Sequence, residues 1–378
     1  MSRVILGSGL ILVGAVFLLT GQGWRMAALW LVGAALGLSL LHASFSFAGA
    51  FRRLLAGGQG DGFRAQLWML ALALLLFQPA IMMGTVLGQP VRGFVFPVGV
   101  ALLLGAFLFG IGMQLGGGCG SGTLFTAAGG QDGRMWITLG AFIAGATLAA
   151  WDGERWLGWP AWPGRTLGEG WSTLPLSLAG LGLGWGAACG WETARRGHIE
   201  PLTWGGGSLL RGPWPWLWGA AALAGLNFLT LLLAGRPWAI TAAFPIWGSQ
   251  LIDAAGWDDP AFWAFWEDPT RSEALLRPML SDRTTVMDLG LMGGALLAAG
   301  LAGRRGGWRL PAPRAAAASL LGGVMLGYGA VLGSGCNISA FFGGIASGSL
   351  HGWVWIVPAL VGNWVGLKLR PTFGLPQN

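Results

Sequence analysis

Charged side chains are scarce in this sequence, since Asp, Glu, Lys and Arg make up only 10% of its 378 residues. Soluble globular domains usually contain about 25% charged residues, so the composition excludes an ordinary protein of that class. Cysteine and histidine are also rare, with three residues of each, and no pair has the spacing of metal ligands. We therefore expect no metal site and no cofactor.

Apolar residues and glycine fill most of the chain, with 54% hydrophobic residues, 69 glycines and a mean hydropathy of +0.62. This composition predicts an all-α polytopic membrane protein, a single transmembrane domain over residues 1–378, with about nine to ten transmembrane helices. The candidate spans are Val4–Thr20, Ala27–Ala43, Ala65–Thr85, Phe94–Leu115, Met135–Trp151, Thr173–Cys189, Trp214–Ala234, Val286–Ala302, Ala315–Leu332 and Trp353–Leu367.

The net charge of +7 does not indicate nucleic acid, because no basic run is interleaved with aromatic residues in a soluble segment. Arginines flanking membrane helices explain the excess better. If the N-terminus is cytoplasmic, that side carries 14 basic and 4 acidic residues, Arg305 and Arg309 among the basic ones. The positive-inside rule therefore predicts that both termini are cytoplasmic.

Two glycine-flanked cysteines stand at equivalent places of an internal repeat. One ungapped alignment of the chain with itself, the repeat register, pairs Cys119 with Cys336. It also pairs Gly105 with Gly322, Gly110 with Gly327, Gly112 with Gly329, Leu115 with Leu332, Phe125 with Phe342, Trp136 with Trp353 and Gly145 with Gly362. The predicted topology makes the copies inverted. We expect a first half at residues 1–151 and a second, inverted half at 173–370.

Four short stretches are predicted to be broken half-helices that meet near the membrane midplane: Phe45–Arg53, Cys119–Gly130, Trp238–Gly248 and Cys336–Gly348. Non-helical backbone survives at membrane depth only where protein or a water-lined cavity satisfies its polar groups. The breaks are therefore expected to line a pathway.

A Trp-rich, acidic insert is expected on the non-cytoplasmic side, at about residues 256–283. Its tryptophans Trp257, Trp263 and Trp266 stand among charged residues, which suits the headgroup zone, so we interpret them as an interfacial anchor, with an exterior lid as the alternative. Tryptophans at span ends, such as Trp156, are interpreted as part of the same interfacial belt.

Each of the paired cysteines is expected where a half-helix starts. Unpaired N–H groups and the helix dipole attract anions there, and they make a thiol more acidic. The predicted substrate pathway consists of Cys119, Cys336, Ser46, Gly118, Gly120, Thr123, Gly335, Asn337, Ser339, Thr241 and His351. Cys189 has no repeat partner. We interpret it as a buried small residue, with a relay thiol as the alternative.

Four segments carry a family resemblance: Leu115–Thr123, Gly333–Ile338, Phe45–Arg52 and Pro237–Phe244. They resemble the YeeE/YedE family of bacterial sulfur-compound transporters. The resemblance implies an inner-membrane protein that takes up thiosulfate through successive contacts with cysteine thiols, beside a small cytoplasmic sulfur-carrier or sulfurtransferase protein. The family's thiosulfate members place a cysteine where this chain has Ser46, so a related sulfur or selenium species is an alternative substrate.

Two other classes of function stay open on the sequence alone. A membrane enzyme acting on a sulfur bond would use a low-pKa thiol as nucleophile, but it needs a base, and only His351 and His42 are available. A channel would conduct a small solute through the broken helices. We therefore expect a transporter, and not an enzyme.

Overall fold

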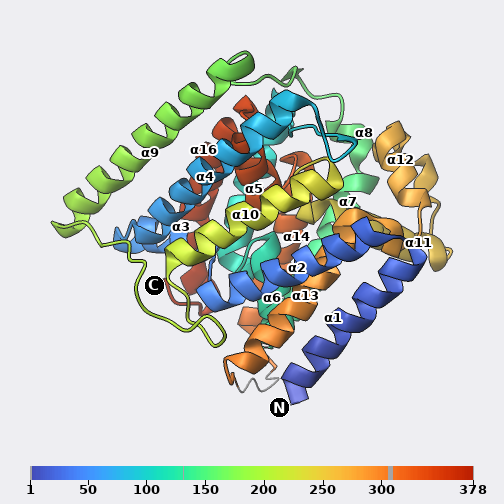
Figure 1. Ribbon diagram of the computed structural model, residues 1–378, viewed down its shortest axis with the longest axis horizontal. Helices are drawn as coiled ribbons and strands as arrows, with labels where there is room; N and C mark the ends of the chain where they lie inside the picture. Colours follow the sequence, from blue (N-terminus) through green and yellow to red (C-terminus); the bar gives the residue numbers. More distant parts are fainter. Residues whose placement is uncertain (1, 131, 305–309, 378) are drawn as a thin grey trace.

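The computed structural model describes residues 2–130, 132–304 and 310–377, which places Arg305 and Arg309 outside the described residues. Long helices dominate it (Figure 1). They are α1 (Ser2–Gly21), α2 (Trp24–Ala43), α4 (Asp61–Met83), α5 (Val100–Gly116), α7 (Arg134–Trp151), α9 (Thr173–Arg196), α10 (Trp216–Ala234), α13 (Arg283–Leu301), α14 (Pro313–Leu332) and α16 (Leu350–Leu369).

Within the described ranges, nine helical segments are long and apolar enough to cross a membrane. The prediction of an all-α polytopic membrane protein is therefore confirmed. The stretch Thr173–Cys189 is not among the nine, although it belongs to α9, because glycines dilute its leucines. In Figure 1, α9 lies at the edge of the molecule, where it packs on α4.

Short helices occur in all four stretches where the sequence predicts a break. They are α3 (Phe47–Gly57), α6 (Gly120–Gly129), η2 (Ile240–Ala242) with α11 (Ala243–Ala254), and the π-helical η6 (Asn337–Phe342) with α15 (Gly343–Ala346). That these helices end at membrane depth, and that the two halves are inverted copies, stays a prediction.

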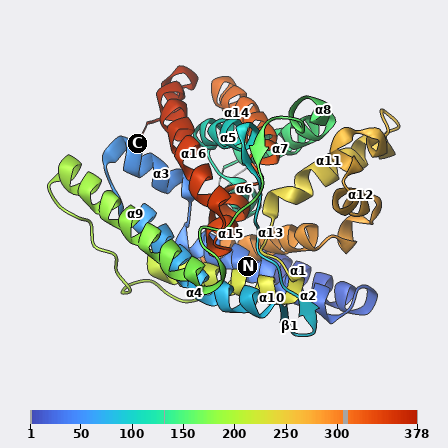
Figure 2. The same cartoon turned by 90° about the horizontal axis from the view of Figure 1, so that it is seen from above.

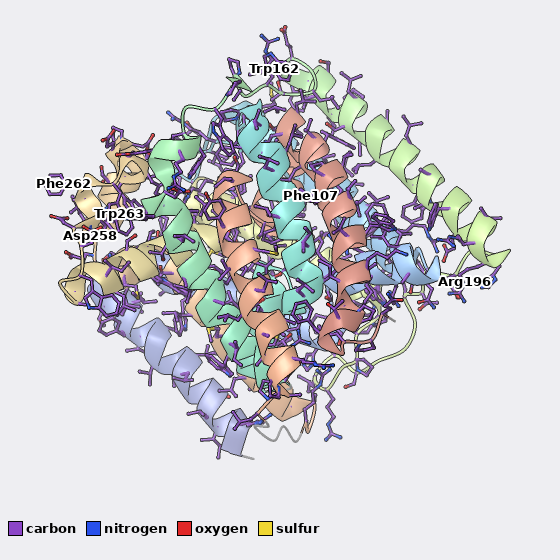
Figure 3. All side chains as sticks on the ribbon, turned by 180° about the vertical axis from the view of Figure 1, so that it is seen from behind. Phe107, Trp162, Arg196, Asp258, Phe262 and Trp263 are labelled. Carbon is purple, nitrogen blue, oxygen red and sulfur yellow. The ribbon has the colours of Figure 1, made fainter. Side chains whose placement is uncertain are left out.

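Glycine contacts bring α7, α14, α5 and α16 side by side in one layer (Figure 3). A Cβ on Gly327 would lie 2.1 Å from the Phe142 carbonyl oxygen, and one on Gly110 would lie 2.2 Å from that of Ala359. The repeat register relates these two contacts, since it pairs Gly110 with Gly327 and Phe142 with Ala359. The same reciprocity relates the Gly145 contact with Val324 to the Gly362 contact with Phe107. This is what an inverted repeat predicts.

A second set of contacts is equally close. α2 packs on α13, where a Cβ on Gly37 would meet the Leu291 carbonyl at 2.0 Å and one on Gly294 would meet that of Ala34 at 1.8 Å. α4 packs on α10. Small residues at these positions allow the helix backbones to touch, which is the usual way that membrane helices associate.

The segments between the long helices contain short strands and short helices. Two-residue strands form antiparallel pairs, β1 (Thr85–Val86) with β2 (Gln89–Pro90), and β3 (Val98–Gly99) with β4 (Ala161–Trp162). The remaining helices are α8 (Gly153–Trp156), η1 (Gly170–Ser172), η3 (Pro260–Phe262), η4 (Ala264–Glu267), α12 (Pro269–Leu276), η5 (Met279–Ser281) and η7 (Arg370–Phe373).

The interpretation of the tryptophans as interfacial is wrong for two in the insert, Trp263 and Trp266, and for Trp156 at a span end. Trp156, Trp263 and Trp266 are 7%, 7% and 2% exposed, because they pack with Phe265 in a small apolar cluster of their own. Trp263 also donates to the Asp258 carboxylate at 2.9 Å, a pair labelled in Figure 3. These side chains hold the insert together and cannot face lipid headgroups.

Candidate functional site

The two cysteine-bearing helices begin against each other in the interior of the molecule, where α6 and α15 lie near the middle of Figure 2. A Cβ on Gly120, the first residue of α6, would lie 3.2 Å from Cys336 Sγ and 3.1 Å from Thr241 Cγ2. The helices then diverge. Beyond the end of α6, Gly130 lies beside the Arg3 guanidinium, whereas Ser347, just past α15, accepts a hydrogen bond from the Phe94 amide.

Both thiols cap the helix that follows them. Cys119 Sγ accepts from the Gly122 amide at 3.4 Å, and Cys336 Sγ accepts from the Ser339 amide three residues on. Small side chains with an acceptor atom are favoured at this position because they satisfy an amide that the helix leaves free. Since each sulfur accepts from its own helix, its S–H remains available to donate to a ligand.

Hydroxyl groups surround the two sulfurs. Ser121 Oγ lies 3.4 Å from Cys119 Sγ, and Ser339 Oγ lies 3.6 Å from Cys336 Sγ. Thr241, from η2, is 3.5 Å from Ser339 Oγ. Three separate segments of the chain therefore bring thiols and hydroxyls to one buried point, where all of these groups can donate hydrogen bonds to an anion.

Glycines make the tight geometry of these helix starts possible. Gly335 has φ +130°, and a Cβ there would lie 2.3 Å from Ser339 Oγ. A Cβ on Gly118 would lie 3.0 Å from the Thr123 amide nitrogen. Only glycine fits at Gly335, because both the backbone conformation and the space exclude a side chain.

Thr123 and Asn337 play different parts. Thr123 Oγ1 donates to the Cys119 carbonyl at 2.8 Å, so its hydroxyl stabilises the helix start. Asn337 is fully buried, and in the part of the chain that the structure describes neither polar atom of its amide has a hydrogen-bond partner. An unpaired buried amide beside Cys336 is available to a ligand, which would offset the cost of its burial.

The site is closed to solvent in this conformation. Cys119 is 1% exposed and Cys336 is 0% exposed. A solute can therefore reach the thiols only after a conformational change that opens the site.

Three of the predicted pathway or relay residues have no hydrogen bond to this cluster among the described residues. Ser46 is half-buried at the start of α3, where its Oγ accepts from the Gly49 amide at 3.0 Å, and no hydrogen bond among the described residues joins it to either cysteine. His351, at the start of α16, bonds to Ser349 Oγ at 2.7 Å, beyond the far end of α15. Cys189 is half-buried on α9. The structure thus brings together Cys119, Cys336, Gly120, Thr241 and Ser339.

Sequence reasoning missed two neighbours of this cluster. Ile240 Cγ2 lies 3.3 Å from the position of a Cβ on Gly120, and nothing in the sequence distinguishes it from other apolar residues. Trp238 donates through Nε1 to Asp288 Oδ1 at 3.2 Å, and Asp288 is fully buried. A signal existed for Asp288, because it is a carboxylate inside the predicted span Val286–Ala302.

Arginines gather on the cytoplasmic side of the predicted topology, around the end of α5. Arg134 donates to the Leu115 carbonyl at 2.6 Å, Arg370 donates to the Gln114 carbonyl, and Arg52 lies within electrostatic range of both. Arg52 also lines a cavity of about 350 Å³ with Arg53, Ala56, Gly57, Gln59 and Arg196. These positive charges attract an anion to the end of α5, and Cys119 follows this end in the chain.

Neither thiol has a base beside it. Among the described residues, the hydrogen-bond partners of the two sulfurs are hydroxyls and backbone amides, and no histidine or carboxylate bonds to them. In the same ranges, no three His, Cys, Asp or Glu side chains are grouped as metal ligands. The chemistry that this arrangement offers is hydrogen-bond donation to an anion.

Comparison with known proteins places the chain. A family model described as sulphur transport matches residues 42–365. The chain belongs to this family of sulfur transporters, which includes YeeE and YedE. The resemblance found in the four sequence motifs is thereby confirmed, and so is the prediction of a transmembrane transport protein.

Two kinds of relatives stand out. The chain is 26% identical to the "Thiosulfate transporter TsuA" of Spirochaeta thermophila over 362 residues, 88% of this chain and 96% of that protein. It is 33% identical to the "Probable transporter YedE" of Escherichia coli and to that of Salmonella typhimurium, over 147 residues in each case. The match covers 38% of this chain and about a third, 35%, of those YedE proteins.

The cap at Ser46 leads to a prediction about the position where the family resemblance implies a cysteine. We expect Ser46→Cys to retain folding and transport, because a cysteine caps the next short helix in the same way at Cys119. Ser46→Ala removes the cap and costs roughly 1 kcal/mol of stability. Thermal melting and anion uptake of both variants, measured side by side, test this. A cysteine variant that melts as low as the alanine variant would contradict it.

Proposed function

We propose that this protein is a transporter, and not an enzyme, that takes a small sulfur-containing anion across the bacterial inner membrane. Thiosulfate is the substrate we propose first, and another sulfur or selenium oxyanion is the alternative. The observation that carries the proposal is the meeting of Cys119 and Cys336 at the starts of two short helices. The similarity to TsuA, which is named as a thiosulfate transporter, supports the choice of anion.

Binding a doubly charged anion away from water requires compensation for its lost hydration. The start of α6 supplies unpaired amide groups and the positive end of a helix dipole, and the continuous run of η6 and α15 adds a second set. The thiols of Cys119 and Cys336 and the hydroxyls of Thr241 and Ser339 donate further hydrogen bonds, which select for the shape of the anion.

The thiols act as hydrogen-bond donors in this proposal. Among the described residues neither sulfur has a base beside it, and the family resemblance implies a third cysteine where this chain has Ser46. A relay that passed the sulfur atom covalently from thiol to thiol would be interrupted at Ser46. A ladder of hydrogen bonds is not interrupted, because a hydroxyl donates as well as a thiol does.

The distribution of charge supports a direction of transport and an orientation of the protein in the membrane. We propose that both termini are cytoplasmic, that the anion leaves toward Arg52, Arg134 and Arg370, and that a cytoplasmic sulfur-carrier or sulfurtransferase protein consumes it there. The excess of arginine on this side supports the orientation. The two halves at 1–151 and 173–370, related as inverted repeats, would each supply one cysteine, and the reciprocal glycine contacts in the repeat register support this organisation.

Sealed vesicles that contain only this protein test the proposal. We expect labelled thiosulfate to accumulate unchanged, whereas an enzyme would release a chemically altered product. Vesicles that admit no thiosulfate, sulfite, sulfate or selenite would overturn it.

Gly120 gives a prediction about the narrowest point of the site. We expect Gly120→Ala to reduce thiosulfate uptake several-fold without unfolding the protein, because the added methyl group enters the gap between the two helix starts, 3.1 to 3.3 Å from Thr241, Cys336 and Ile240. Gly140→Ala on α7 is the matched control, since a Cβ there meets no atom within 4 Å. Equal uptake by the two variants would show that no substrate passes Gly120.

A further inference from the structure

A buried carboxylate lies one hydrogen bond away from the segment that completes the site. Asp288 of α13 is 0% exposed, and its Oδ1 accepts from Trp238 Nε1 at 3.2 Å. Its Oδ2 has no partner among the described residues. It stands six residues after the helix cap Asp282, about 9 Å along the axis of a helix whose sequence is otherwise apolar at this depth.

An ionised carboxylate in this position is expensive. Charges buried in a protein or membrane interior cost several kcal/mol unless they are paired and fully hydrogen-bonded. Asp288 has one neutral donor and, among the described residues, no cation bonded to it. Ionisable residues inside membrane spans that lack full pairing commonly bind ions or protons as part of function.

The charges around Asp288 do not compensate it. Asp282 is the charged group that acts on Asp288, and it has the same sign. Arg236 and Arg283 lie nearer to Asp282, where they bond to Thr284 Oγ1 and to the Ala234 carbonyl. Of the elements packed on α13, α6 and η2 carry no ionisable residue.

The helices α1 and α2, which also pack on α13, carry three ionisable groups. Arg3 bonds to the Gly129 and Arg304 carbonyls, and Arg25 bonds to the Leu87 carbonyl and to Gln89 Oε1. His42 stands at the end of α2.

Trp238 links this carboxylate to the cysteines. Thr241 follows Trp238 three positions later in the chain, and it covers both Gly120 and Ser339. α13 holds the same segment at a second point, because Trp247 of α11 donates to Thr285 Oγ1 at 2.9 Å. Opening the site at this segment strains its bonds to α13, and the Asp288–Trp238 bond is one of these.

We propose that Asp288 is a proton-binding site and that proton binding there is coupled to anion binding at Cys119 and Cys336. This proposal rests on the proposed function, anion transport, and names the proton as the ion that drives it. An anion beside Thr241 disfavours a second negative charge at Asp288, so it promotes proton uptake. The protonated carboxyl holds the Trp238 indole less tightly than a carboxylate does, because charge-assisted hydrogen bonds are about twice as strong as neutral ones. The segment is then freer to open.

Proton uptake on anion binding is the direct test, and it needs neither vesicles nor a known orientation. Thiosulfate is titrated into the purified protein in two buffers of different ionisation enthalpy, which gives the number of protons taken up per anion bound. We expect a value approaching one in the wild type at a pH where Asp288 is mostly ionised in the free protein and mostly protonated in the anion-bound protein. We expect close to none in Asp288→Asn, with binding retained, because the amide oxygen still accepts from Trp238. Asp253→Asn, at an exposed acidic residue of α11, keeps the wild-type value.

Transport supplies a second readout. With the membrane potential held at zero, an imposed gradient of about one pH unit drives roughly tenfold accumulation per coupled proton. Wild-type vesicles show this accumulation, and Asp288→Asn vesicles only equilibrate the anion. Equal proton uptake by wild type and Asp288→Asn would overturn the proposal. Absence of thiosulfate binding in every form would instead refute the proposed function.

A second variant keeps the test decisive if Asp288→Asn does not fold. Trp238→Phe removes the one donor to the carboxylate, and since that bond favours the charged form, the pH range of proton uptake moves upward. A purely structural role for Asp288 would lower the melting temperature in this variant and leave the pH range where it is, which would also overturn the proposal.

Discussion

Thiosulfate uptake falls to the level of empty vesicles when either Cys119 or Cys336 is replaced by alanine. This is the expected result because the two thiols stand at adjoining helix starts, so each variant removes one of the few donors that replace the hydration shell of the anion. The protein itself remains folded. Alanine costs the helix cap, roughly 1 kcal/mol, and fills almost the same volume. Uptake of labelled thiosulfate, normalised to folded protein, measures the effect.

Two further kinds of variant distinguish hydrogen bonding by the thiols from covalent transfer and from a packing role. Cys189→Ala is the matched control, since Cys189 is half-buried on α9, away from the pair, and we expect it to be nearly silent. Serine at Cys119 or Cys336 keeps both the cap and the donor. If hydrogen bonds carry the anion, the serine variants retain part of the uptake, whereas covalent transfer requires both thiols. Wild-type uptake in both alanine variants would assign the cysteines to packing alone.

Much of this fold could be predicted from the sequence because membrane helices leave strong local signals. The apolar runs predicted nearly all of the spans, and the glycine breaks before Cys119 and Cys336 located the short helices. The repeat register pairs glycines that lie in reciprocal contacts in the structure. These signals are local, or they repeat within the chain, so one sequence contains them.

The rest depends on tertiary contacts that no local pattern encodes. Ile240 and Thr241 reach Gly120 only because α13 holds their segment through Trp238 and Trp247. Likewise, Trp263 is buried because it belongs to a cluster that includes Trp156 and Leu332 from outside the insert, although charged residues flank its segment on both sides. In both cases a distant element decides which way the side chain faces.

The largest expected loss of stability comes from leucine at Gly327, which we predict prevents assembly of the folded protein. A Cβ there would lie 2.1 Å from the Phe142 carbonyl oxygen and 2.4 Å from the Ala146 amide nitrogen, both backbone atoms of α7. No rotamer relieves such a contact, so α7 and α14 must separate. Overpacking of flexible side chains costs about 1–3 kcal/mol, and a clash with backbone exceeds that range.

The yield of monodisperse protein in detergent, measured by size-exclusion chromatography, tests this prediction. Gly140→Leu is the matched control, because Gly140 also lies in the middle of a spanning helix, is exposed, and has no atom within 4 Å of a Cβ. Gly110→Leu tests the inverted repeat in the same experiment. Gly110 is the repeat partner of Gly327, and a Cβ there would lie 2.2 Å from the Ala359 carbonyl, so we expect the same loss. Equal yields from Gly327→Leu and Gly140→Leu would refute the close packing of α7 on α14. A well-folded Gly110→Leu would show that Gly110 and Gly327 are not structurally equivalent, which would contradict the inverted repeat.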